Sequence, residues 1–251
     1  MISIVVPLFN YSMFIKDNIE SICCQTIQDW ELIIVDDGST DNPYDIIKLY
    51  ESDKIKYIRL DENKGYGNAK NVGIRAANGE WVIVLDADDM LTKNSLEVRL
   101  LAMNKKQKKW CHAKAYEFGG VEPPYHFKNK ARRSFLRFQN MRITGNYRNL
   151  WKSIHAQTVM IDMDVYRKVG LYEPSLRSMG DKEMWARIIN NVGKPLFVDK
   201  FVAYYRQHGL QMHRSEAKRK NLHRYEGILK KCMRKFKKGN LSDALSLWEI
   251  T

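Results

Sequence analysis

The sequence predicts an α/β fold in which helices flank a mostly parallel β-sheet. Apolar runs alternate with helix-like patterns through the first hundred residues, which is the spacing of βαβ units. Polar, acidic segments follow three of these runs, where the carboxyl ends of the strands would lie. The chain has 251 residues, of which 44% are hydrophobic, and no internal repeat. It is therefore long enough for a sizeable core.

The first hundred residues are expected to form four strands. Each is an apolar run, and the third alternates as a strand near a sheet edge does. The runs are Ser3–Leu8, Glu31–Asp41 with its polar turn, Lys54–Leu60 and the segment Glu80–Asp89. The apolar N-terminal stretch is interpreted as the first strand, because it is too short for a signal peptide or a membrane-spanning helix.

Three helices are expected between these strands, because apolar residues recur at helical spacing. The stripes are formed by Ile15, Ile19, Ile22 and Cys23, by Ile46, Ile47, Leu49 and Tyr50, and by Ala69, Val72, Gly73 and Ala76. Strands joined by such helices run parallel, so their carboxyl ends are expected at one edge of the sheet.

The second half of the chain is less regular. We expect a strand over Trp110–Phe118, followed by a basic, aromatic-rich segment from Gly119 to Arg148. A helix over Met184–Val192 and strand material over Lys194–His208 are expected beyond it. The expected organisation is one domain over 1–210, divided into an N-terminal half over 1–103 and a C-terminal half over 104–210. A basic helical extension over 211–251 follows, with an apolar stripe from Leu222 to Phe236.

The charge is unevenly distributed, which suggests two kinds of partner. The formal net charge of +13 combines −7 over residues 1–103 with +11 over 104–153 and +10 over 204–238. Four cysteines, Cys23, Cys24, Cys111 and Cys232, show no CxxC spacing. We interpret them as free thiols, so the expected location is the cytoplasm, with peripheral attachment to the inner face of the membrane through the basic blocks as an extension of that prediction.

Two of the acidic segments differ in whether turn and cap chemistry can explain their carboxylates. Asp36 and Asp37 fit either a ligand site or the turn and cap chemistry that precedes a helix. Asp86, Asp88 and Asp89 exceed what a cap needs, since three carboxylates leave one buried strand. Clustered carboxylate oxygens suit Mg²⁺ or Mn²⁺. The chain has no GxxxxGK[ST] loop and no GxGxxG after a strand, so a bound nucleotide would need a metal to neutralise its phosphates.

The motifs, taken together, resemble a known family. "SIVVPLFNY", "QTIQDWELIIVDDGSTD", "NKGYGNAKNVGIRAANGEWVIVLDADD" and "GDKEMWAR" followed by "YYRQH" are similar to the successive motifs of family 2 inverting glycosyltransferases of the GT-A fold. The resemblance covers roughly residues 1–208. It implies a nucleotide-diphosphate-sugar donor, with a UDP-sugar favoured, and a divalent cation, Mn²⁺ or Mg²⁺. It does not imply a particular sugar or acceptor, because one fold hosts many specificities.

The resemblance also implies which residues bind the donor. Pro7, Phe9 and Asp37 would line the nucleobase pocket, with Asp37 accepting a hydrogen bond from a uracil-type ring. Asn10, which follows the first strand, belongs to the same donor site. Lys70 stands where the family usually has arginine, which puts a bidentate phosphate or sugar contact there in doubt, since lysine is a point charge.

The acid segment after the fourth strand would hold the sugar end of the donor and the metal. Asp86 would approach the ribose and the sugar, with Ala87 beside it. Asp88 would ligate the metal, with Asp89 next to it. His208 matches a position that reaches the metal or the pyrophosphate in several relatives, and the alternative is a structural histidine.

Asp181 matches the family's catalytic base. Inverting transfer needs one carboxylate to take the proton of the acceptor hydroxyl as its oxygen attacks the anomeric carbon. Asp181 also opens the expected Met184–Val192 helix, so the alternative is a helix cap. Gly180 stands where many relatives have glutamate, so a helper role of that glutamate is absent here.

Three acceptor classes fit the basic segments. The first is a cell-envelope or lipid-linked glycan at an anionic membrane surface. The second is an anionic polymer such as a teichoic-type phosphate chain. The third is nucleic acid with hydroxylated bases, which is the least favoured because no recognised DNA-binding motif is present. A nucleotide-sugar-binding scaffold is the non-enzymatic alternative, and the presence of both Asp88 and Asp181 weighs against it. The sequence predicts no oligomeric state.

Overall fold

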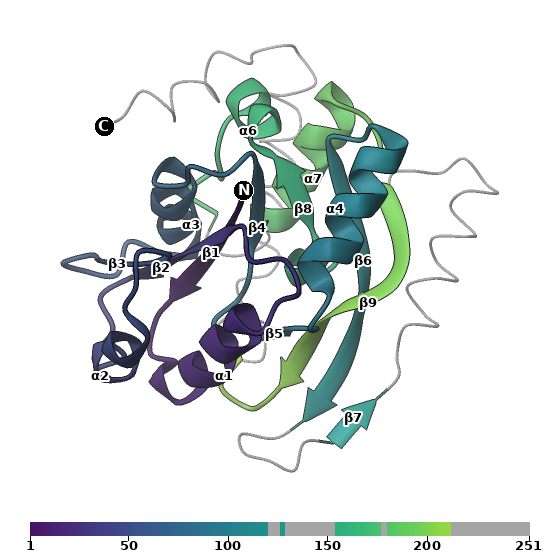
Figure 1. Ribbon diagram of the computed structural model, residues 1–251. Helices are drawn as coiled ribbons and strands as arrows, with labels where there is room; N and C mark the ends of the chain where they lie inside the picture. The colour runs from purple at the N-terminus through teal and green to yellow at the C-terminus, as the bar shows by residue number, and fades with distance from the viewer. Residues whose placement is uncertain (120–125, 129–153, 177–179, 212–251) are drawn as a thin grey trace.

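The computed structural model describes residues 1–119, 126–128, 154–176 and 180–211. The described strands form one nine-stranded sheet in the order β3-β2-β1-β4-β8-β6-β9-β5, and β7 pairs with β6 at the side (Figure 1). The expected α/β fold class is confirmed. The expected extension over 211–251 and most of the basic segment 119–148 lie outside the described residues.

The N-terminal half of the sheet is entirely parallel. Strand β1 pairs with β2 on one side and β4 on the other, and β3 forms the edge beyond β2. The elements are β1 (Ile2–Leu8), α1 (Ser12–Cys23), β2 (Trp30–Asp36), α2 (Tyr44–Ile47), η1 (Lys48–Tyr50), β3 (Ile55–Arg59), α3 (Tyr66–Arg75) and β4 (Trp81–Val84). The predicted strands and helices of this half are thus present in the predicted order.

The strands that follow β4 form a mixed parallel and antiparallel part of the sheet. Strand β8 runs antiparallel to β4 and β6, whereas β6 and β9 are parallel and lie side by side as two long strands (Figure 1). The elements are β5 (Met90–Leu91), α4 (Ser95–Lys106), β6 (Trp110–Gly119), β7 (His126–Lys128), η3 (Ala156–Thr158), β8 (Met160–Asp162), α6 (Met163–Val169), α7 (Gly180–Asn191) and β9 (Leu196–Gln207). Strand β9 also pairs with β5, which returns the end of the described chain to the segment after β4.

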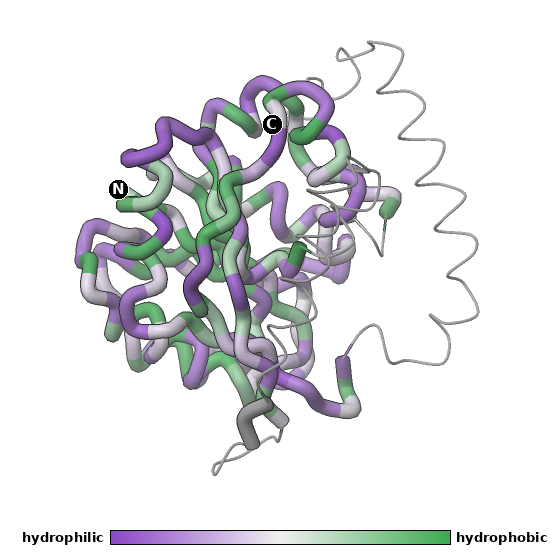
Figure 2. The backbone as a smooth tube through the Cα atoms, turned by 90° about the vertical axis from the view of Figure 1, so that its right-hand side faces the viewer, coloured by the Kyte–Doolittle hydropathy of each residue, from purple (hydrophilic) through white to green (hydrophobic). Residues whose placement is uncertain are grey.

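The core explains why β1 is a continuous apolar run. All seven of its residues are buried, because neighbouring strands occupy both edges and helices cover the faces of a parallel sheet. Ile15, Ile19 and Ile22 of α1 are fully buried, as their spacing predicts, and each contributes about 1.5–3 kcal/mol by leaving water. In Figure 2 the apolar stretches run through the middle of the molecule, whereas many outer loops are hydrophilic.

Several elements were not expected from the sequence, and β5 and α4 are two of them. Strand β5 has two residues and immediately follows the acidic segment, so it gives no periodicity. Helix α4 buries Arg99 in the face that also holds Leu96 and Met103. The guanidinium donates to the carbonyl oxygens of Ser95 and Val159, so a buried cation interrupts the apolar stripe. No described helix is both long and apolar enough to span a lipid bilayer.

Candidate functional site

The carboxyl ends of β1, β2 and β4 meet at one edge of the sheet, as expected for parallel strands. The backbone N–H of Asn10 donates to Ser39 Oγ at 3.0 Å, and Asn10 Oδ1 accepts from the N–H of Thr40 at 2.8 Å. Asn10 has a φ of 55°, in the left-handed region that asparagine tolerates. The predicted donor residue Asn10 therefore joins the loops after β1 and β2.

The other donor residues predicted after β1 and β4 differ in exposure. Pro7 is buried within β1, where it lies opposite Val35 of β2. Phe9 keeps 42% of its surface exposed, so its ring is accessible to a ligand. Ala87 is buried between the acidic residues of the next loop.

Asp36 is fully buried and fully paired. Its Oδ1 accepts from the N–H of Ser39 at 2.8 Å, and its Oδ2 accepts from Tyr57 Oη and Arg59 Nη1, each at 2.6 Å. Burial and then the bond to Asp36 raise the pKa of Tyr57 to about 12, so the phenol remains a donor. Asp36 thus has the structural role that was the alternative interpretation for this pair.

Asp37 anchors the loop before α3. Its Oδ1 accepts from the N–H of Lys64 and its Oδ2 from the N–H of Gly65, both at 2.8 Å. Gly38 next to it has a φ of 74°, and a Cβ there would lie 2.9 Å from the carbonyl carbon of Glu62, so the close approach of these two loops requires glycine. The predicted contact of Asp37 with a nucleobase would add to these two bonds.

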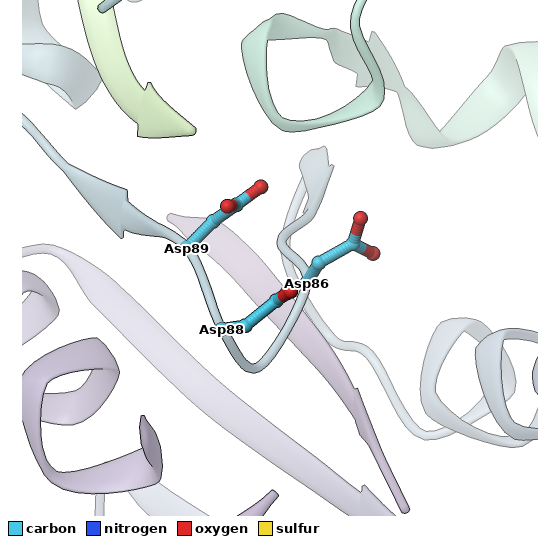
Figure 3. Close-up of side chains that lie close together, drawn as sticks. All are labelled: Asp86, Asp88 and Asp89. Atoms are coloured by element: carbon cyan, nitrogen blue, oxygen red, sulfur yellow. The ribbon is translucent and has the colours of Figure 1, made fainter. Parts of the chain in front are cut away.

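The three carboxylates after β4 leave one tight turn (Figure 3). Asp86, Asp88 and Asp89 can each offer an oxygen such that the three oxygens lie within 4.8 Å of one another. Asp89 is fully buried and Asp88 is 6% exposed. The structure therefore brings the predicted metal-binding residues together, in a setting where like charges repel unless a cation balances them.

The turn is held by buried donors from two other elements. Asn18 of α1 donates through Nδ2 to the carbonyl oxygens of Asp86 and Asp89, at 3.0 and 2.9 Å. Arg206 of β9 donates through Nε to the carbonyl oxygen of Asp88 at 2.8 Å. Because these bonds go to backbone carbonyls, they fix the shape of the turn without consuming the carboxylates.

Arg206 is itself held rigidly. Its guanidinium lies between the rings of Phe14 and Phe118, with Cζ 4.8 and 4.7 Å from their centroids. It also pairs with Asp17 through Nη2 at 2.7 Å. This arginine links α1, β6 and the acid turn, so the turn is positioned by both halves of the sheet.

Asp88 and His208 form the contact that best fits a metal site. His208 Nε2 lies 2.9 Å from Asp88 Oδ2, and both side chains are nearly buried. Two ligand atoms at right angles on an octahedral ion with bonds of about 2.1 Å lie about 3 Å apart, so a dication could replace the proton between them. Within the described chain, His208 Nδ1 and Asp89 Oδ2 are buried without a hydrogen-bond partner. The donor set, carboxylate oxygens with one imidazole, suits Mn²⁺ or Mg²⁺.

The two carboxylate oxygens of Asp89 differ in their partners. Its Oδ1 accepts from the backbone N–H of Arg206 at 2.9 Å, which ties β9 to the turn. Burial, followed by the charges of Asp88 and Asp86, raises the pKa of Asp89 well above its usual range. Only Oδ2 is left for a cation, so Asp89 is a weaker candidate ligand than Asp88.

Asp86 faces away toward α3. It accepts a hydrogen bond from the hydroxyl of Tyr66, and burial, followed by the charge of Asp88, raises its pKa to about 6. The charge of Lys70 acts in the opposite direction. Asp86 is thus placed between the acid turn and α3, where a sugar or ribose hydroxyl could reach it.

Lys70 and Asp181 contact each other. Lys70 Nζ lies 2.5 Å from Asp181 Oδ1, and Lys70 is 1% exposed. The ammonium also lies over the rings of Tyr66 and Tyr172, at 3.8 and 4.5 Å from their centroids. In the described residues, the side chain of Asp181 therefore accepts its hydrogen bond from Lys70 of α3. A helix cap would instead accept from a backbone N–H of α7.

Four residues of the site escaped sequence reasoning: Asn18, Tyr66, Tyr172 and Arg206. Asn18 and Arg206 lie inside an expected helix and strand, where they would be taken as exposed polar positions. A polar residue within an otherwise buried stripe is the signal that could have identified Asn18, which follows Ile15 by three positions. Tyr66 and Tyr172 carry no such signal, because a tyrosine beside a helix is ordinary core material.

Comparison with known proteins gives the family and the fold of the chain. The profile of "Glycosyl transferase family 2" matches residues 3–170. An uncharacterized glycosyltransferase of Rickettsia typhi is 28% identical over 75% of this chain and 58% of its own length. The putative teichuronic acid biosynthesis glycosyltransferase TuaG of Bacillus subtilis is 29% identical over 82% of this chain and 79% of its own length. The chain thus spans less than two thirds of the Rickettsia relative.

Solved structures share the fold. S. aureus TarS 1–349 in complex with UDP-GlcNAc aligns with a TM-score of 0.68 and 20% identity, over 86% of this chain and 60% of that one. A second crystal structure of TarS 1–349 aligns with a TM-score of 0.64 and 21% identity, over 82% of this chain and 60% of that one. Because the profile covers about two thirds of the chain and the fold agrees, the chain belongs to glycosyl transferase family 2 and has the GT-A fold.

Proposed function

We propose that the chain is an inverting, metal-dependent glycosyltransferase that moves a sugar from a UDP-sugar to a hydroxyl group of a cell-envelope or lipid-linked glycan. The observation that carries the proposal is the joint placement of the Asp88–His208 contact and the Lys70–Asp181 pair around one strand end. The first offers ligands for a cation, and the second offers a carboxylate. Family membership supports the reaction class.

In the proposed reaction Asp181 is the general base. Its Oδ1 is bound to Lys70, and the side chain is 28% exposed, so Oδ2 can accept the proton of an acceptor hydroxyl. Loss of that proton strengthens the attack of the hydroxyl oxygen on the anomeric carbon from the face opposite the nucleotide, which inverts the configuration. Asp86 would hold a hydroxyl of the donor and keep the sugar oriented during the attack.

Asp88 and His208 would hold the dication, with Asp89 Oδ2 nearby. Bound there, a dication stabilises the negative charge that develops on the leaving diphosphate. Phe9, which is exposed after β1, and Asp37 would face the base of the nucleotide. UDP is favoured as the nucleotide because TarS, which has the same fold, has been solved with UDP and with UDP-GlcNAc.

The proposed acceptor follows from charge and from one relative. The basic segments suggest an anionic surface or polymer, and they lie largely outside the described residues. A second acceptor class, an anionic polymer, is favoured by the similarity to TuaG, whose name assigns it to teichuronic acid biosynthesis. With either acceptor class, the proposed location of the activity is the cytoplasm, at the inner face of the membrane.

A donor screen tests the proposal. Nucleotide release is measured from a panel of UDP-, GDP- and TDP-sugars, with and without Mn²⁺, and with Asp88→Asn as the matched control. We expect release from a UDP-sugar that requires Mn²⁺ and is lost in the variant. Release that is independent of metal contradicts the roles of Asp88 and His208, and binding of UDP-sugars without release or transfer would favour the scaffold alternative.

A further inference from the structure

The proposed reaction requires the carboxylate of Asp181, but it does not require that this carboxylate be paired with a buried lysine. Lys70 is 1% exposed, and an ammonium is costly to bury unless it is paired. Its charge is balanced by Asp181 at 2.5 Å and by Asp86 through space. The buried ammonium of Lys70 therefore interacts with two carboxylates: Asp86, which is proposed to contact the donor, and Asp181, the proposed base.

The aromatic rings around Lys70 fix where its ammonium lies. Tyr66 of α3 and Tyr172, which follows α6, place their ring faces 3.8 and 4.5 Å from Nζ, as in a cation–π contact. Burial, followed by the charge of Asp86, raises the pKa of Tyr66 well above its usual range, and burial does the same for Tyr172. Both rings therefore stay neutral, and Lys70 has no anionic tyrosine as an alternative partner.

Helix α7 is oriented independently of this pair. Glu183 and Arg187 are buried in it and pair with each other, and Arg187 Nη1 donates to the carbonyl oxygens of Val169 and Leu171, each at 2.8 Å. This anchors α7 to the segment after α6. Removing the charge of Lys70 should therefore change the carboxyl of Asp181 without displacing the helix.

We infer that Lys70 is a positioning residue whose ammonium holds Asp181 Oδ1, so that Oδ2 is left for the acceptor hydroxyl. The inference rests on the proposed function for its catalytic meaning. The pair itself can be tested without substrate. The charged and titratable groups that face Asp181 from the packed elements are Lys70 and Tyr66 of α3, Asp86 after β4, Tyr166 of α6 and Tyr172. Lys70 is the cation among these groups.

The first experiment compares the carboxyl signals of the full chain, labelled with ¹³C at aspartate, at one neutral pH and without ligands. Asp181→Asn assigns the signal. In Lys70→Met we expect the chemical shift of the Asp181 carboxyl to change, because Oδ1 loses the charged hydrogen bond from Nζ. Lys70→Arg should return the signal toward its wild-type position because it restores a charged donor. An unchanged Asp181 signal in folded Lys70→Met overturns the inference.

A matched control has the same type of pair at a different place. Lys109 Nζ lies 2.5 Å from Asp162 Oδ2, at the amino end of α6, and Lys109→Met should leave the Asp181 carboxyl signal unchanged. If Lys70→Met does not fold, the reciprocal variant Asp181→Asn carries the test. In protein labelled with ¹⁵N at lysine, the Nζ signal of Lys70 should shift when its partner loses its charge. An unshifted signal contradicts the pair.

Transfer assays separate this inference from the proposed function. In Lys70→Met kcat should fall and Lys70→Arg should restore part of it, while UDP affinity stays close to the wild-type value. If the Asp181 signal moves but the wild type transfers no sugar from any donor, the pair stands and the proposed function fails. If transfer occurs and kcat is unchanged in Lys70→Met, the function stands and the inference fails. A loss confined to UDP affinity would assign Lys70 to the diphosphate and also overturn it.

Discussion

The two acidic strand ends of this protein look alike in sequence and differ in their surroundings. The loops after β2 and β4 read "VDDGS" and "LDADD", and both lie at the same edge of the sheet. Asp36 and Asp37 have every carboxylate oxygen bound, to backbone N–H groups, a tyrosine and an arginine. The second loop instead has raised pKa values at Asp86 and Asp89, together with one buried carboxylate oxygen, Asp89 Oδ2, that lacks a hydrogen-bond partner in the described chain.

From this difference we infer that the number of donors near an acidic segment, and not the number of carboxylates, distinguishes a structural turn from the proposed cation site. A carboxylate whose acceptor sites are filled by the protein is stable without a metal. A carboxylate that lies against others and has few donors is stabilised by a cation or by uptake of a proton. The first loop therefore should affect stability when changed, and the second should affect activity.

The largest expected effect is that of Asp88→Asn. Loss of this carboxylate removes the contact with His208 and weakens binding of the dication, which supplies several kcal/mol of charge stabilisation to the transition state. Sugar transfer in Mn²⁺ should fall by more than about 1,000-fold, and the rise of the melting temperature on adding Mn²⁺ should disappear. Asp164→Asn, at an exposed ion pair, is the control. Retention of the Mn²⁺ response in Asp88→Asn would place the cation elsewhere.

Asp181→Asn should have the next largest effect. It keeps the shape of the side chain but cannot accept a proton, so kcat should fall by at least about 100-fold, while UDP affinity remains near the wild-type value. The melting temperature should fall as well, because the buried ammonium of Lys70 loses its charged partner. Isothermal titration with UDP and a transfer assay check this prediction. A wild-type kcat in the folded variant would contradict the role of Asp181 as the base.

Asp36→Asn should have the opposite effects to Asp88→Asn: it should lower stability and keep the response to Mn²⁺. The amide nitrogen would face Tyr57 or Arg59 as a second donor, so a buried hydrogen bond is lost at a cost of about 1–3 kcal/mol in the free energy of unfolding. Urea unfolding measures this loss. The folded variant should still gain thermal stability from Mn²⁺, and failure to do so would make the first loop part of the cation site.

Tyr57→Phe sharpens the comparison with the smallest expected change. The hydroxyl is one of the donors to Asp36, and Arg59 remains at 2.6 Å, so the free energy of unfolding should fall by about 0.5–1.5 kcal/mol. Transfer activity should not change. A loss of activity in this variant would show that the β3 side of the loop contacts the donor.

The predictable regions of the molecule are those with local signals. Strand β1 and helix α1 followed from apolar periodicity, and the acidic residues after β4 were identified because three carboxylates at a strand end exceed any capping need. The Lys70–Asp181 contact could not be predicted, because it joins α3 to α7 over 111 positions and nothing in either local pattern specifies the partner. Helix α4 was missed because buried Arg99 hides its apolar face.

The return of β9 has a consequence for how the protein is made. The bonds from Arg206 and His208 to the acid turn join positions 117 to 120 apart, and contacts of such sequence separation form late. A nascent chain that ends before position 206 would therefore hold its acidic turn in water, with neither the guanidinium nor the imidazole in place. Competence for chemistry would then arrive only once β9 has been made.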